Sequence, residues 1–263
     1  GPKPPLSETS EKPIGEISRP FAEFARRNRC NLICPIYTEQ SGRYYNAAVV
    51  IDRDGRYVGE YRKINPTEGE LEQGLTPGPI DPPVFDLDFG TIGIQICFDV
   101  NWHDNWTRLR QKGAEIIFWP SAFAGGEMLN GLAWINKVPI VSSTKIKPTK
   151  MVDELGDEIV STGRFGEWVC GPINLDFANV QGWQMINRFD QVRRRYGRKV
   201  NVKIKHEEAW GLLESLSPDV SIAEVMKEFG LETSSQMLSR NTTLQDSHRP
   251  VERVSPESVQ KPS

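Results

Sequence analysis

Cys97 is the residue whose type and position best suit covalent chemistry. The alternating, β-branched run 91–97 predicts a strand, and a turn after it leads to a helix predicted over 103–112. A strand end holds a side chain rigidly, and the N–H groups of the following turn point toward whatever it attacks. A thiol is mostly protonated at neutral pH, so it needs a nearby cation, a general base or those N–H groups. The competing interpretation is an unreactive core thiol.

The elements around Cys97 include both hairpins and helices. Helices are predicted over 17–29, 103–112, 126–136, 185–196 and 221–229. Strands are predicted over 30–38, 45–52, 57–63, 84–87, 91–97, 114–119, 138–144, 168–175 and 200–205, with a hairpin over 150–162. Residues 64–79 form a loop, and after about residue 235 the composition predicts a loose or partner-docked tail. This mixture predicts mixed sheets covered by helices, a layered α/β architecture of one domain.

Composition and charge exclude several classes of protein. Hydrophobic residues make up 38% and charged residues 25% of the 263 residues, as in ordinary globular proteins. The net charge of -3 implies no bulk attraction to nucleic acid or to anionic membranes. No apolar run approaches the roughly 20 residues that cross a bilayer, and residues 1–5 lack the pattern of a signal peptide. We therefore predict no membrane segment and no nucleic-acid partner.

The other three cysteines, Cys30, Cys34 and Cys170, follow no disulfide or metal pattern. The interval between Cys30 and Cys34 is wrong for a CxxC redox motif or zinc knuckle. A chain of this length needs no disulfides to fold. We expect buried strand thiols, no metal site and, by default, a reducing cytoplasmic setting.

Three segments resemble the nitrilase superfamily of carbon–nitrogen hydrolases. They are residues 61–70 (YRKINPTEGE), 93–99 (GIQICFD) and 113–121 (GAEIIFWPS), in this order. The resemblance extends from roughly residue 17 to 214. It implies an α/β fold of the four-layer αββα sandwich type with mixed sheets, usually dimerised through helices, so we expect a homodimer or higher homo-oligomer.

The resemblance divides the chain into three parts. Residues 1–16 would be an irregular N-terminal segment and residues 17–214 the carbon–nitrogen hydrolase domain. Residues 215–263 would be a C-terminal helix and polar tail.

The resemblance also implies a Glu–Lys–Cys catalytic set. Cys97 would be the nucleophile, and the Lys63 ammonium would favour its thiolate and stabilise the oxyanion formed on attack. The backbone N–H of Phe98 is the natural second oxyanion donor. Glu70 matches a supporting glutamate in the pattern Lys-x-x-Pro-Thr-x-x-Glu, where it would hold Lys63 or position substrate. The alternative for Glu70 is a solvated loop carboxylate, since other glutamates lie on both sides of it.

Such a set would hydrolyse a small-molecule amide or carbamoyl compound through a thioester, with no metal or organic cofactor. Nitrile-cleaving members usually follow the nucleophile with Trp-Glu-Asn. Residues 98–100 are Phe-Asp-Val here, which looks more like the amidase and carbamoylase branches. Trp102, Trp106, Phe123 and Trp134 are candidates to line an apolar pocket, although such aromatics more often belong to a core.

The general base of the family has no match in this sequence. It lies early, in a Pro-Glu pair after a strand, and no such pair precedes Lys63. Glu8, Glu11 and Glu16 lie in the irregular stretch and match nothing in the pattern. The resemblance therefore predicts a chain truncated at its start, with the first strand and the base missing, and feeble or absent activity.

Two other functions stay open. His206 and Glu208 have the His-x-Glu spacing of glutamine amidotransferases with a Cys–His–Glu triad, but those enzymes flank the nucleophile with small residues, unlike Ile96 and Phe98. Without its base, the chain would instead be a non-catalytic partner in an oligomer, through its tail and the helix over 221–229. The arginines and lysines of 193–205 match no nucleic-acid motif and are interpreted as a solvated face.

Overall fold

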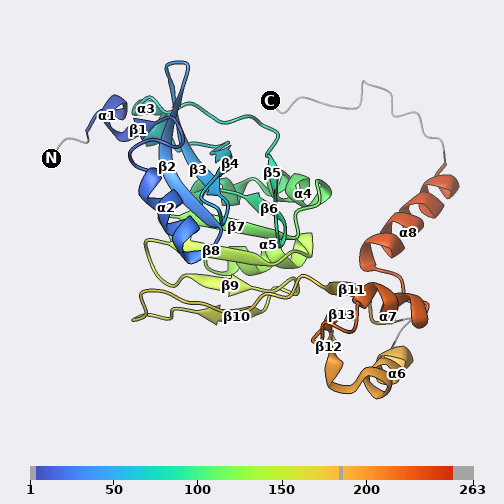
Figure 1. Cartoon of the computed structure of the whole chain (residues 1–263). Coiled ribbons are helices and arrows are strands. Elements are labelled where there is room, and N and C mark those ends of the chain that lie inside the picture. The colour runs from blue at the N-terminus through green and yellow to red at the C-terminus, as the bar shows by residue number, and fades with distance from the viewer. Residues whose placement is uncertain (1–3, 184–185, 251–263) are drawn as a thin grey trace. The chain divides into compact units, whose positions relative to one another are not determined.

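A computed structural model describes residues 4–183 and 186–250 (Figure 1). The chain divides into two compact units, Gly1–Leu175 and Asp176–Ser263. This division differs from the boundary predicted at residue 214. The boundary lies before residue 176 because the strand β11 (Phe177–Gln181) pairs with β13 (Trp210–Ser215), so both belong to the second unit.

The first sheet of unit 1 has the order β1-β2-β3-β4. Its strands are β1 (Ser10–Glu11), β2 (Leu32–Gln40), β3 (Arg43–Ile51) and β4 (Tyr57–Arg62). β2 and β3 form a hairpin whose turn residues Ser41 and Gly42 both have positive φ angles. The predicted turn at Asp54-Gly55 joins β3 to β4, and Gly55 has a φ of 78°.

The N-terminal segment 1–16 is not irregular throughout, contrary to the prediction. The helical turn α1 (Leu6–Thr9) buries Leu6, and β1 then runs parallel to β2, with Ser10 beside Tyr37. Local composition does not reveal this pairing, because it depends on a strand far along the chain.

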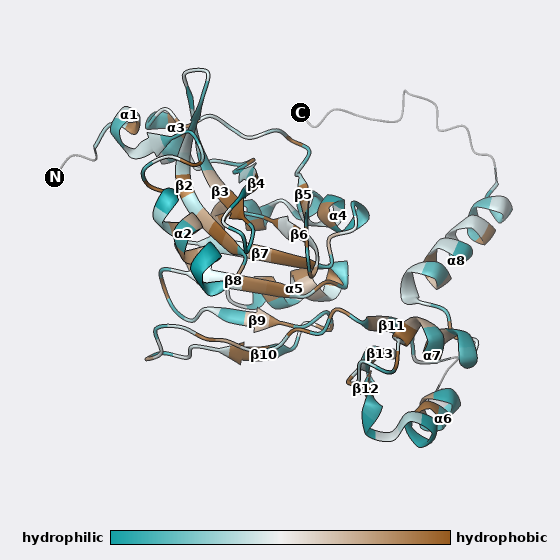
Figure 2. Cartoon of the chain, in the orientation of Figure 1, coloured by the Kyte–Doolittle hydropathy of each residue, from teal (hydrophilic) through white to brown (hydrophobic). Residues whose placement is uncertain are grey.

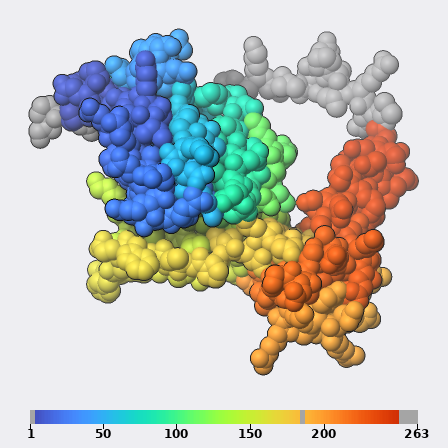
Figure 3. Space-filling model, in the orientation of Figure 1, coloured from blue at the N-terminus to red at the C-terminus, as the bar shows by residue number. Residues whose placement is uncertain are grey.

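The second sheet of unit 1 is mixed and has the order β10-β9-β8-β7-β6-β5. Its strands are β5 (Val84–Leu87), β6 (Gly90–Ile94), β7 (Ile116–Ser121), β8 (Ile140–Thr144), β9 (Lys150–Val152) and β10 (Glu158–Ser161). The central strands β6, β7 and β8 are parallel, and the outer pairs are antiparallel. In the space-filling view the β9–β10 hairpin, coloured yellow, forms one border of unit 1 (Figure 3).

Successive side chains of a strand point to opposite faces of the sheet, so β3 can pack on a helix on one side and on the second sheet on the other. This packing forms the first three layers: helix, sheet and sheet. On β3, Val49 and Ile51 pack with Ala25 of α2 (Arg19–Asn28), which covers the outer face of the first sheet. Val50 points the opposite way and packs with Ile94 of the second sheet. Figure 2 shows the brown, apolar strands lying between helices with teal surfaces.

The helices α4 (His103–Gln111) and α5 (Glu127–Asn136) form the fourth layer. Leu109 and Leu132 from these helices pack on Ile117 of β7 in a fully buried cluster. Unit 1 is therefore the αββα sandwich that the resemblance predicted, with mixed sheets.

Unit 2 is a three-stranded antiparallel sheet of order β11-β13-β12, where β12 is Val200–Lys205. Its core brings together Phe189 of α6 (Ile186–Tyr196) and Val225 of α7 (Ile222–Glu228). The short η2 (Gly197–Lys199) follows α6, and α8 (Ser234–His248) ends the described part.

Several local predictions were wrong. No strand forms over 168–175, where Trp168 is exposed and Cys170 is exposed too, rather than a buried strand thiol. The predicted loop after β4 contains the short helix α3 (Glu68–Glu72). The described part of the polar tail forms α8, whose start Thr233 caps by accepting from the backbone N–H of Gln236 at 3.2 Å. Residues 251–263 of the predicted tail lie outside the described residues.

Candidate active site

Lys63 follows β4 directly and is almost completely buried, with 2% of its surface exposed. Its backbone N–H donates to the carbonyl of Asn46 at 2.8 Å, which continues the pairing with β3. A buried ammonium needs a negatively charged partner, because removal from water penalises the charge. The Lys63 Nζ lies 2.5 Å from the Glu70 Oε2 and donates a hydrogen bond to it.

Glu70 is held at the start of α3 by a capping box. Its Oε2 accepts from the backbone N–H of Thr67 at 2.7 Å, and its Oε1 accepts from the Asn46 Nδ2 at 2.7 Å. Burial raises the pKa of Glu70, but the hydrogen bonds from Lys63, Thr67 and Asn46 outweigh it and hold the pKa below its ordinary value. These contacts are not those of a solvated loop carboxylate.

Cys97 lies in the sharp turn between β6 and the 3₁₀-helix η1 (Cys97–Asn101). Its φ of 49° is in the left-handed region, which a residue with a Cβ adopts only under strain. The Trp119 Nε1 donates to the Cys97 carbonyl at 3.1 Å, and the residue is partly exposed. The amide of Phe98 is in the first turn of η1, where N–H groups have no partner inside the helix.

Asp99 connects the turn after β6 to the segment around β4. Its Oδ2 accepts from the Tyr61 hydroxyl at 2.7 Å and from the backbone N–H of Ile96 at 3.1 Å. Its Oδ1 accepts from the backbone N–H and the side-chain amide of Asn65, at 2.8 and 2.9 Å. Asp99 has no exposed surface, and burial raises its pKa although these hydrogen bonds oppose the shift.

The hydrogen bond between Tyr61 and Asp99 joins residues that lie close in sequence to Lys63 and Cys97. Tyr61 precedes Lys63 by two residues, and Asp99 follows Cys97 by two. Neither Asp99 nor Tyr61 was predicted from the sequence to belong to the site. The available signal was a charged residue two positions after a candidate nucleophile, at the end of an apolar strand.

Two of the predicted pocket aromatics neighbour the turn that holds Cys97. Trp102 is exposed and makes an edge-to-face contact with Phe98, with ring centroids 5.3 Å apart. Phe123 makes a similar contact with Trp119 at 5.2 Å.

The other two aromatics pack elsewhere. Trp106 is a residue of α4 whose side chain is fully buried in the core, and it donates to the Asp99 carbonyl at 3.4 Å. It therefore does not line an open pocket. Trp134 lies on α5, where the Lys137 ammonium stands 3.2 Å from its ring centroid.

The early glutamates do not supply an evident base. The Glu11 carboxylate accepts from the backbone N–H of Ile17 at 2.6 Å and of Ser18 at 2.8 Å, and also from the Ser18 hydroxyl. Burial raises the pKa of Glu11, but these bonds outweigh it and lower the pKa overall. Glu8 and Glu16 are exposed. None of the three contacts Lys63 or Cys97 through a hydrogen bond or ion pair within the described residues.

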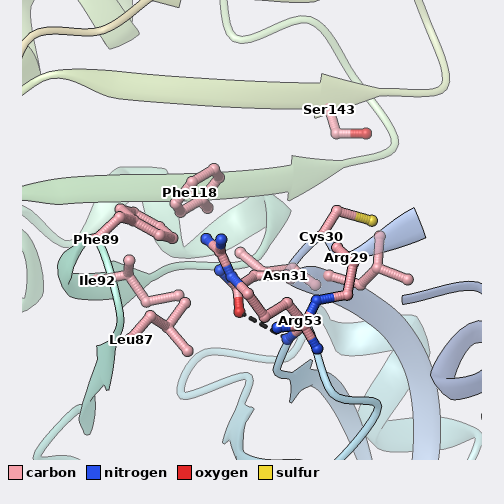
Figure 4. Close-up of a pocket in the computed structure, with 11 residues that line it drawn as sticks. Arg29, Cys30, Asn31, Arg53, Leu87, Phe89, Ile92, Phe118 and Ser143 are labelled. Atoms are coloured by element: carbon pink, nitrogen blue, oxygen red, sulfur yellow. Dashed lines mark hydrogen bonds between the residues drawn. The ribbon is translucent and has the colours of Figure 1, made fainter. Parts of the chain in front are cut away.

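Both units contain hollows among the described residues. One, of about 460 Å³, has apolar walls from Ile92 and Phe118, with Arg29 and Arg53 beside them (Figure 4). A second, of about 470 Å³, is lined by Asn65 and by the start of α4. A third, of about 240 Å³, lies in unit 2.

The third hollow contains His206, the candidate base of the amidotransferase alternative. His206 follows β12 and lines the hollow together with Glu207 and Phe189.

Across residues 4–183 and 186–250, no three His, Cys, Asp or Glu side chains cluster in a way that would hold a metal ion. In the same residues no helix has the length and apolar character to cross a membrane.

The αββα layers define the class of fold, and solved structures share it. The Nit3 protein of Saccharomyces cerevisiae, a member of branch 10 of the nitrilase superfamily, matches with a TM-score of 0.53 and 21% identity, over 61% of this chain and 66% of its own. An amidase from Nesterenkonia sp. matches with a TM-score of 0.50 and 19% identity, over 54% and 60%. The family model described as carbon-nitrogen hydrolase matches residues 3–176, and the chain belongs to this family.

Three relatives whose names give an activity are similar to this chain in sequence. The N-carbamoylputrescine amidase of Oryza sativa subsp. japonica is 29% identical over 171 residues, 58% of this chain and 56% of its own. The beta-ureidopropionase of Arabidopsis thaliana is 31% identical over 124 residues, 45% and 30%. The citrullinase of Francisella tularensis is 26% identical over 204 residues, 65% and 68%. The chain spans about half the length of the first of these relatives and less of the second.

Proposed function

We propose that the chain carries the nucleophile and oxyanion donors of an amidohydrolase, with Cys97 as nucleophile and Lys63 as the oxyanion-stabilising cation. The observation that carries the proposal is the burial of the Lys63 ammonium against Glu70, which fixes a cation at the end of β4. A charge held in position in this way needs no reorganisation to stabilise an oxyanion. The Asp99 bonds to Tyr61 and Asn65 support it further, because they join the two segments.

The reaction begins with attack of the Cys97 thiolate on the carbonyl carbon, which forms a carbon–sulfur bond. The oxyanion is stabilised by the Lys63 ammonium and the Phe98 amide. Collapse breaks the carbon–nitrogen bond, and the nitrogen leaves as ammonia or an amine after taking a proton. Water then attacks the thioester, releases the acid and restores the thiol. Glu70 balances the charge of Lys63 and holds it in position.

The substrate class is proposed from the relatives. They are named for action on N-carbamoylputrescine, on a ureido acid and on citrulline, all of which contain a carbamoyl group. We propose an N-carbamoyl compound or a simple amide as the substrate. Phe98, Trp102 and Phe123 are the proposed apolar contacts for the substrate's carbon chain, and Trp134 remains a weaker candidate.

A general base is still required to take the proton of Cys97. Because the Glu11 carboxylate already accepts hydrogen bonds from Ile17 and Ser18, we propose a base outside the described residues. Positioned proton transfer contributes about 10²–10⁴-fold to such reactions. Without such a base, the 263-residue chain would be slow or inactive.

The test measures ammonia release from small amides and N-carbamoyl compounds. The chain is compared with a version extended at its N-terminus and with the Cys97→Ala variant of each. We expect the extended chain to be faster and Cys97→Ala to abolish release, whereas Cys170→Ala, at an exposed thiol, changes nothing. Equal rates with and without Cys97 would exclude the mechanism.

We also propose that the chain assembles as a homodimer through α5. This helix buries Leu129 and Leu132 on one face, yet it exposes Met128 by 41% and Ile135 by 65% on another. Gly131 lies between these two along the exposed face, with open space around it. A helix that is apolar on both faces is usually covered on both. A second copy of the chain is the proposed cover.

A further inference from the structure

The hollow beside the candidate active site is built from two segments. The loop after β4 lines it through Ile64, Asn65 and Ile80, and the start of α4 lines the other side. Its volume of about 470 Å³ is within the range of about 300–1,000 Å³ that small-molecule sites occupy. Asn65 also donates to Asp99, so an occupant would touch a residue that holds the Cys97 turn.

Asn105 is a largely buried residue whose side chain lines this hollow. It is 5% exposed, and its backbone N–H donates to the Trp102 carbonyl at 3.2 Å. Its side-chain amide has no hydrogen-bond partner among the residues that the structure describes. Because this amide lines the hollow and makes no hydrogen bond within the protein, both its donor and its acceptor are available to a polar occupant.

Asp104 and Arg108 place opposite charges on the same wall. They are four residues apart on α4, a spacing at which such side chains commonly pair. No ion pair joins them in the described part of the chain. The Arg108 guanidinium instead donates to the Ile80 carbonyl at 2.9 Å, which leaves further N–H groups for an occupant. The hollow therefore presents one cation and one anion separately.

The start of α4 adds a preference for a negative group near Arg108. The helix has nine residues, and no side chain caps its first turn. The Asn105 N–H already donates to the Trp102 carbonyl, so the N–H groups of His103 and Asp104 are those left to bind an anion.

We propose that this hollow binds a small amino acid-like zwitterion. Its carboxylate lies against Arg108 and the first turn of α4, its ammonium faces Asp104, and Asn105 supplies a further hydrogen bond. The hollow shares Trp102 with the proposed substrate contacts, but zwitterion binding here does not require the Cys97 thiol.

Calorimetric titration of the full chain with three probes tests the proposal. The probes are 3-aminopropanoate, propanoate, which lacks the amine, and propylamine, which lacks the carboxylate. We expect 3-aminopropanoate to bind most tightly and propylamine least. Arg108→Gln should weaken binding of 3-aminopropanoate by about tenfold or more, as for a lost charge-assisted bond. Arg110→Gln, on the same helix but outside the hollow, should have no effect.

Further variants separate this site from the hydrolytic one. Asp104→Asn should remove the advantage of 3-aminopropanoate over propanoate, and Cys97→Ala should bind all three probes as the unchanged chain does. Thermal melts check that each variant is folded. Lack of saturable binding of 3-aminopropanoate, or equal affinity in folded Arg108→Gln, would overturn the proposal.

Discussion

The Tyr61 hydroxyl donates a 2.7 Å hydrogen bond to the Asp99 carboxylate, deep in the interior of unit 1. The bond joins residues 38 positions apart and lies two residues from both Lys63 and Cys97. The bond therefore holds the end of β4 and the turn after β6 in one arrangement.

Tyr61→Phe is expected to destabilise the fold. It removes one donor from a buried carboxylate, at a cost of about 1–3 kcal/mol in the free energy of unfolding. Urea denaturation measures the change. Tyr57→Phe is the matched control, because Tyr57 lies on the same strand and is exposed. Equal losses in the two variants would contradict the role given to this bond.

Glu70→Ala is expected to be costly because it leaves the Lys63 ammonium buried without its partner. Breaking a buried ion pair typically costs about 3–5 kcal/mol, and the partial exposure of Glu70 puts the value near the lower limit. Glu72→Ala, at an exposed position of the same helix, is the control. The measurement is again urea denaturation, and a Glu70→Ala loss no larger than that of Glu72→Ala would refute the pairing.

The Glu70 contribution to stability should depend on pH in one direction. Its pKa is lowered in the folded state, so its stabilisation is fully present above the unfolded pKa of 4.5 and is lost as the pH falls through the folded value. The stability difference between the chain and Glu70→Gln should therefore be constant from about pH 6 to 8 and shrink below about pH 4.5. A stability difference that grows as the pH falls would mean that folding raises the pKa of Glu70, which would contradict the prediction.

Cys97 should react with iodoacetamide faster than the other thiols. Burial, with a smaller effect from the Glu11 charge, raises the pKa of Cys34 to about 11, so this thiol should be slowest. Cys170 is exposed and serves as the ordinary reference. Peptide mapping after timed labelling gives each rate, and Lys63→Met should slow Cys97 by about tenfold, because a cation that favours the thiolate is lost. A Cys97 rate at or below that of Cys170 would favour the non-catalytic oligomer partner instead.

Ile135→Glu should convert the proposed dimer into a monomer. The substitution places a charge on the exposed apolar face of α5, which a dimer would have to bury. Light scattering after size exclusion measures the mass. Phe21→Glu, at an exposed position on α2, is the control for a new surface charge. A mass unaffected by Ile135→Glu would exclude this face as the interface.

The sandwich was predictable because its strands repeat a simple alternation. Val49 and Ile51 face one layer and Val50 the other, so a period of two in the sequence already indicates two buried faces. The hairpin turns were predictable for a similar reason, since Gly55 and Gly156 adopt the positive φ angles that glycine favours.

Other elements depend on contacts that the sequence does not display. β13 was not predicted, and its Gly211 weakens the strand pattern. A Cβ there would meet the Phe189 ring at 2.7 Å, so close packing of α6 requires the glycine. The candidate site was visible in the sequence only in part. Lys63, Glu70 and Cys97 belong to recognisable motifs, whereas the bonds of Asp99 join residues distant in the chain.

The left-handed backbone of Cys97 has a consequence for which residue suits this turn. Glycine adopts a φ of 49° without the strain that a Cβ adds, so backbone conformation alone would favour glycine at this position. A thiol at so unfavourable a backbone position is what the proposed nucleophile would require, because the same turn that strains the residue presents its side chain at the strand end.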